Sequence, residues 1–185
     1  MVFGFFKKNK DDKKQEAPQL EDLVLSKLRP GYLVDYDMNT YQVAARNCYK
    51  WEEGGVTDEW ELKLGDQVFY LERIEEDGYV EWSLCQKFSI SELEGDIAAH
   101  IQEHEDPPET VTLKGTQFHF EEDDIGEFFR GDSKEPMHFV SWDYEDETEQ
   151  KFLTIEQWGE SKFDLTLGFS VEEYQFSNIL PGEPF

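Results

Sequence analysis

Three side chains have the types and the spacing of a transition-metal site. Asp96, His100 and His104 follow one another at intervals of four residues, so on a helix they would share one face. Imidazole and carboxylate groups are ligands that zinc and related metals accept. The zinc-protease motif HExxH is absent from this segment. Asp96, His100 and His104 therefore form a metal-site hypothesis, and a solvated helix face is the alternative.

Signatures of other catalytic chemistries are missing from the sequence. Neither the phosphate-binding GxxxxGK[ST] loop nor the dinucleotide-binding GxGxxG motif occurs. The serine within 168–172 lacks the closing glycine of a nucleophile elbow. Residues 35–46 begin like a calcium loop, but Thr40 replaces the required glycine and Arg46 the closing glutamate. We therefore expect a protein that is not an enzyme and has no cofactor, with a cryptic hydrolase or metalloenzyme as the least favoured alternative.

The charge of the chain limits its partners. Its 185 residues include 43 Asp and Glu against 17 Lys and Arg, which gives a formal net charge of −26. Binding to nucleic-acid phosphates requires a basic surface, so we expect no nucleic-acid partner. The same charge would attract a basic surface on another protein.

The N-terminal residues differ in character from the rest. We expect residues 1–18 to form a flexible tail, in which Phe3, Phe5 and Phe6 precede a run of lysines. Inserted aromatic rings and lysines near anionic headgroups would give at most a weak contact with a membrane surface. No apolar run approaches the ~18 residues of a transmembrane helix. With two cysteines and no secretory leader, we expect a cytoplasmic location.

Alternation of apolar and polar residues dominates the body of the chain. It is clear in Trp60–Leu64 and Tyr79–Leu84, and again in His138–Tyr144 and Phe163–Leu167. Period-two alternation rich in aromatic and β-branched residues predicts half-buried strands. The short polar turns between these segments predict that the strands pair antiparallel.

Two segments have helical spacing instead. Apolar residues within 20–28 recur on one helical face ahead of Pro30, and those within 89–106 do so ahead of Pro107. The sequence therefore predicts an N-terminal helix and a linking helix at 89–106.

The β regions on either side of the linking helix are alike in pattern. We therefore expect a mainly β fold of antiparallel sheets in two similar meander lobes, 19–88 and 107–185, within a single globular domain spanning 19–185. An internal duplication would explain the likeness. Chance similarity between alternating strands is the alternative.

Several short motifs resemble a bacterial family known as domain of unknown function 4178. They are Leu28–Gly31 followed by Tyr41–Val43, Trp60–Leu62 followed by Tyr70–Leu71, Gly126–Glu127, and Phe152–Glu156 followed by Gly168. The resemblance covers most of residues 28–180. It implies a cytoplasmic, β-rich bacterial protein, and none of its motifs carries catalytic chemistry.

The aromatic content suggests a binding function. The chain has 5 Trp, 8 Tyr and 15 Phe, more than a core of this size needs. We expect Trp51, Trp142 and Trp158 to bind a partner, with burial as the alternative for each. The expected function is that of a non-enzymatic, acidic accessory or adaptor protein that binds another protein. The alternative is a small-ligand-binding β protein whose carboxylates and ring faces hold an apolar ligand or a polyamine-like cation.

Overall fold

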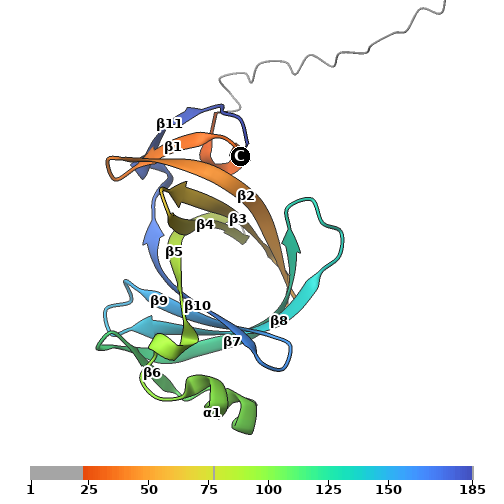
Figure 1. Ribbon diagram of the computed structural model, residues 1–185, viewed down its shortest axis with the longest axis vertical. Coiled ribbons are helices and arrows are strands. Elements are labelled where there is room, and N and C mark those ends of the chain that lie inside the picture. The colour runs from red at the N-terminus through yellow and green to blue at the C-terminus, as the bar shows by residue number, and fades with distance from the viewer. Residues whose placement is uncertain (1–22, 77, 185) are drawn as a thin grey trace, which may run out of the picture.

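In the computed structural model, which describes residues 23–76 and 78–184, eight strands close into a barrel (Figure 1). The strands are β1 Leu33–Tyr36, β2 Asn39–Trp51, β3 Val56–Leu64, β4 Gln67–Glu76, β5 Tyr79–Phe88, β6 Thr110–Leu113, β7 Thr116–Arg130, β8 Met137–Asp146, β9 Phe152–Trp158, β10 Lys162–Val171 and β11 Phe176–Leu180. The helical elements are α1 Ile97–His104 and the short 3-10 helices η2 Leu25–Lys27, η3 Ile90–Glu92 and η4 Glu173–Gln175. The mainly β class predicted from the alternation is confirmed.

The barrel runs in the order β2-β3-β4-β5-β10-β9-β8-β7 and closes where β7 pairs with β2. Every pair of neighbouring strands is antiparallel. Strands β1 and β11 extend the sheet beyond β2, and β6 extends it beyond β7 (Figure 1). The element order repeats, because a short strand, a long strand and three further strands occur first as β1–β5 and then as β6–β10.

Both contacts that close the barrel join one half of the chain to the other. Strand β2 pairs with β7, with Lys50 opposite Glu127, and β5 pairs with β10, with Cys85 opposite Gly168. The structure is therefore one closed barrel, which corrects the prediction of two similar meander lobes. Period-two patterns show which segments become strands, but they do not show which strand edges meet. The internal duplication stays a prediction.

The helices are shorter than predicted. Within 89–106 the α-helix covers only Ile97–His104, because Ser89 caps the separate turn η3 and Gly95 adopts a φ of 88° between them. The prediction of an N-terminal helix at 20–28 also needs correction. Its described part holds only the turn η2, after which Leu28 is extended at ψ 142°.

The apolar side chains pack on the outside of the barrel. On β3, Trp60 and Leu62 are fully buried on the face opposite Glu59 and Glu61. They belong to a first outer cluster that η2, β1 and β11 cover, and the indole Nε1 of Trp60 donates to the carbonyl of Leu28 at 3.0 Å. A second outer cluster packs β8–β10 against η3, α1 and β6. The interior of the barrel is thereby left to polar and aromatic side chains.

Candidate functional site

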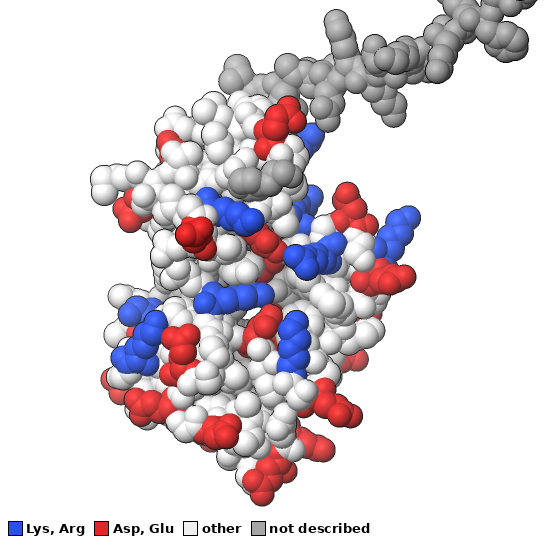
Figure 2. Space-filling view, viewed as in Figure 1, with Lys and Arg blue, Asp and Glu red and all other residues white. Residues whose placement is uncertain are grey.

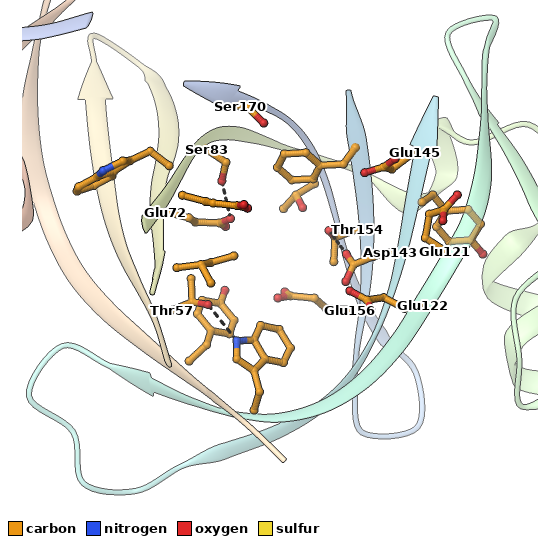
Figure 3. A pocket seen from close by; sticks show the side chains of 18 residues that line it. Thr57, Glu72, Ser83, Glu121, Glu122, Asp143, Glu145, Thr154, Glu156 and Ser170 are labelled. Carbon is orange, nitrogen blue, oxygen red and sulfur yellow. Dashed lines mark hydrogen bonds between the residues drawn. The ribbon is translucent and has the colours of Figure 1, made fainter. Parts of the chain in front are cut away.

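The barrel surrounds a cavity of about 320 Å³ that is partly open to solvent. All eight barrel strands contribute residues to its lining, and Figure 3 shows their side chains converging on it. This volume is near the lower end of the ~300–1,000 Å³ that small-molecule sites occupy. The cavity therefore has room for a small organic ligand.

Acidic residues dominate the polar part of the lining. Seven of the lining residues are acidic, namely Glu72, Glu81, Glu121, Glu122, Asp143, Glu145 and Glu156. None of the lining residues is Lys or Arg. On the outer face seen in Figure 2, by contrast, Lys and Arg side chains lie among the acidic ones. Negative charge is therefore more concentrated in the lining of the cavity than on this outer face.

The strand period explains why carboxylates point inward. On β4, Glu72 alternates with Leu71, and on β9, Glu156 alternates with Ile155. Leu71 and Ile155 are buried in the two outer clusters, so their neighbours must face the interior. Figure 3 shows Glu72 and Glu156 pointing into the cavity from opposite sides.

Glu156 is the most confined of these carboxylates. Its residue is 5% exposed, and its Oε2 is buried without a hydrogen-bond partner among the described residues. Burial raises the pKa of Glu156 to about 8, and the negative charges of Glu59 and Glu72 add to the rise while Lys87 opposes it. A buried carboxylate oxygen without a donor is costly to keep ionised. A ligand that brings a donor or a positive charge would remove this cost.

Glu72 and Asp143 are half-buried and keep part of their surface open to the cavity. Glu72 accepts hydrogen bonds from Ser83 Oγ at 3.1 Å and Cys85 Sγ at 3.6 Å, and Asp143 accepts one from Thr154 Oγ1. Burial raises the pKa of Glu72 to about 7 and that of Asp143 to about 6. Three carboxyl groups of the cavity therefore change protonation near neutral pH.

Lys87, whose positive charge opposes the rise in the pKa of Glu156, contacts other groups of the barrel. Lys87, further along β5 than Ser83, lies 3.3 Å from Asp164 Oδ2, with its ammonium 4.7 Å from the centre of the Tyr70 ring. Burial alone would lower the pKa of Lys87, but Asp164, Glu59 and Glu156 raise it above its ordinary value. Lys87 therefore stays charged and offsets only part of the negative charge inside the barrel.

Aromatic rings form one wall of the interior. Tyr49 and Trp51 stack with centroids 5.8 Å apart, and Phe139 contacts both Trp51 and Trp158. Gly126 permits this packing, because a Cβ at that position would lie 2.5 Å from Cζ of Phe139. The indole Nε1 of Trp51 donates to Thr57 Oγ1 at 2.9 Å, which holds the Trp51 ring in place beside the cavity.

The tryptophans predicted to bind a partner do not lie on one surface. Trp51 and Trp158 belong to the aromatic wall inside the barrel. Trp142 is 5% exposed and packs in the second outer cluster. Their role in binding a protein partner stays a prediction.

The residues of the metal-site hypothesis lie on and before α1. The rings of His100 and His104 are 4.4 Å apart, whereas the carboxylate of Asp96 caps the helix by accepting from the backbone N–H of Ala99. Within residues 23–76 and 78–184, no three His, Cys, Asp or Glu side chains are grouped closely enough to hold a metal ion. The hypothesis therefore has no support from the geometry and stays a prediction.

Phe3, Phe5 and Phe6, predicted to touch a membrane, lie outside the described residues. Over the part of the chain that the structure describes, every helix is too short or too polar to cross a membrane.

Sequence reasoning missed the cavity carboxylates. The only local signal for Glu72 and Glu156 is that each directly follows an apolar residue, Leu71 or Ile155, within a strand pattern. In an open sheet, a glutamate at such a position faces water. It indicates a cavity residue only when the sheet closes into a barrel.

The raised pKa values predict that stability falls as pH rises. The folded protein binds protons more tightly at Asp143, Glu72 and Glu156 than the unfolded chain does, so raising the pH from about 4 to about 8 favours the unfolded state. We expect the melting temperature to drop by about 5 °C or more over this range, since 1 kcal/mol corresponds to roughly 2–4 °C in a domain of this size. Calorimetric melts at several pH values and constant ionic strength measure this. A melting temperature that rises steadily with pH would contradict it.

The model of the family described as "Domain of unknown function (DUF4178)" matches residues 29–173. The match includes all eight barrel strands and therefore the whole lining of the cavity. Neither the curated proteins nor the solved structures gave a match.

Proposed function

This chain belongs to the DUF4178 family, and from its cavity we propose that it binds a small organic cation without transforming it. The ligand enters the barrel, where Glu72, Asp143 and Glu156 neutralise its charge and the aromatic wall covers its apolar part. This proposal takes up the ligand-binding alternative drawn from the sequence. The adaptor role and the cytoplasmic location remain predictions.

The observation that carries the proposal is the imbalance of charge in the lining. Seven acidic residues and no Lys or Arg surround about 320 Å³ of space. A cleft with low-dielectric walls and charge of one sign concentrates counter-ions. A bound cation would also offset the burial and the repulsion that together raise the pKa of Glu156.

Two features favour an organic cation over a metal ion. Glu72 and Glu156 approach the cavity from opposite sides, and the described residues provide no group of acidic side chains close enough to chelate an ion. The aromatic side chains Tyr49, Trp51 and Phe152 line the same cavity. Aromatic faces attract ammonium groups and cover hydrocarbon, neither of which a small hydrated metal ion needs.

A matched set of five-carbon ligands tests the proposal. We expect pentylammonium to raise the melting temperature of the full-length protein by about 5–11 °C at 100 times its Kd, since such binding adds about 2.7 kcal/mol. Neutral pentanol and anionic pentanoate are expected to cause no shift. Spermidine, a larger cation, extends the set. Differential scanning fluorimetry followed by isothermal titration calorimetry at about pH 8 provides the measurement.

The pH dependence gives this test a control. Because protonation neutralises the cavity carboxylates, affinity for pentylammonium should weaken as the pH falls below the pKa of about 7 at Glu72 and about 8 at Glu156. Equal binding of pentanol and pentylammonium, or no binding of any cation at about pH 8, would rule the proposal out.

A further inference from the structure

The unpaired oxygen of Glu156 restricts the kind of cation that the cavity can hold. We infer that the site selects primary ammonium ions, R–NH₃⁺, over quaternary ammonium ions of the same chain length. This inference rests on the proposed function and specifies the chemical class of its ligand.

The missing hydrogen bond at Glu156 Oε2 is the first argument for this selection. Buried polar atoms in proteins nearly always have a hydrogen-bond partner, yet Glu156 Oε2 has none among the described residues. A quaternary ammonium carries no N–H and would leave this oxygen unpaired. A primary ammonium carries three N–H donors and would supply the missing bond.

The number of available acceptors is the second step. Glu72 accepts hydrogen bonds from Ser83 and Cys85, and both reach its Oε2. Asp143 accepts its hydrogen bond from Thr154 at Oδ1. Each of these two carboxylates therefore keeps one oxygen that accepts no hydrogen bond from the described residues. Together with Glu156, which accepts no hydrogen bond from the described residues, the lining therefore has free carboxylate oxygens on the strands β4, β8 and β9. A primary ammonium that bonds to Glu156 Oε2 therefore finds other acceptors in the lining for its remaining N–H groups, whereas a quaternary ammonium can use none of them.

The lining also has an apolar surface against which the substituent R can pack. The only polar atom of the Trp51 side chain already donates to Thr57, so the rest of its ring is an apolar surface. Ile74 and Phe152 line the same cavity. A methylene chain or a ring attached to the ammonium would pack against these side chains, which favours amines with an apolar part over the ammonium ion itself.

The barrel already holds one primary ammonium in this manner. The Nζ of Lys87 lies 3.3 Å from the carboxylate of Asp164 and 4.7 Å from the centre of the Tyr70 ring. Carboxylate on one side and an aromatic ring on another is the combination that the cavity presents to a ligand.

Three ligands that share a five-carbon chain and one positive charge test the selection. Isothermal titration calorimetry of the full-length protein at about pH 8.5 would compare pentylammonium, pentylguanidinium and trimethylpentylammonium. We expect pentylammonium to bind about tenfold or more tightly than the quaternary ion, since hydrogen bonds to charged groups are among the strongest single contacts. In Glu156→Gln this ratio should fall towards one. In the control Glu145→Gln, at a half-buried lining residue, the ratio should persist.

The possible outcomes test the selection for primary ammonium separately from the proposed function. If the quaternary ion binds as tightly as pentylammonium and pentylguanidinium, both of which carry N–H donors, the selection is wrong while the cation cavity stands. If none of the three binds, the proposed function fails with it. Should Glu156→Gln fail to fold, the ratio measured on the wild-type chain still decides the inference.

Discussion

The double variant Glu72→Gln/Glu156→Gln is expected to bind pentylammonium about a hundredfold more weakly while melting at a higher temperature than the wild type at about pH 9. Affinity falls because two charged acceptors of the ligand become neutral, each costing about tenfold. Stability rises because two carboxylates that burial and mutual repulsion hold at raised pKa values no longer have to ionise. At about pH 5, where the wild-type groups are protonated, the two proteins should melt alike.

Opposite signs for affinity and stability distinguish a binding site from a structural network. Titration calorimetry and thermal melts on the same samples would measure both quantities. Glu59→Gln is the matched control, because Glu59 is buried and hydrogen-bonded by Asn47 and Tyr49 but does not line the cavity. We expect it to keep affinity within about threefold. A double variant that melts lower at every pH would indicate that Glu72 and Glu156 serve folding instead.

Gly168→Ala is expected to destabilise the fold by about 1–3 kcal/mol, and Gly168→Val by more. Gly168 lies on β10 where this strand pairs with both β5 and β9. A Cβ at this position would overlap the ring of Phe152 and lie 2.6 Å from Cys85 Sγ. Both clashes involve side chains of adjacent strands, so a methyl group fits only if these side chains shift.

Urea unfolding followed by circular dichroism gives this loss as a change in the midpoint concentration. Ser170→Ala, at an exposed residue on the same strand, should change stability by no more than about 0.5 kcal/mol. Combining Gly168→Ala with Phe152→Leu should recover part of the loss, because the smaller side chain leaves room for the new methyl group. A Gly168→Ala protein as stable as the wild type would show that Phe152 and Cys85 can make room for a methyl group at no cost.

The strands and the apolar faces could be read from the sequence. The alternation in Trp60–Leu64 predicts a strand, and β3 contains this segment with Trp60 and Leu62 buried on one face. Aromatic and β-branched residues suit a pleated, half-buried surface wherever the strand is placed. Local pattern therefore determines that a strand forms and which of its faces is apolar.

The cavity could not be read in this way, because it depends on which strand edges pair. Glu72 and Glu156 belong to different halves of the chain, and only the β2–β7 and β5–β10 pairings bring their side chains to opposite sides of one space. The same closure decides that Trp158 joins the interior wall while Trp142 packs outside.

The amino-acid sequence by itself thus determined the strands, their two faces and the excess of negative charge. The tertiary structure alone decided that the polar face would be enclosed instead of solvated. The physical reason is that alternation distinguishes one face of a strand from the other, whereas enclosure depends on hydrogen bonds between edges far apart in the chain, to which any strand can contribute.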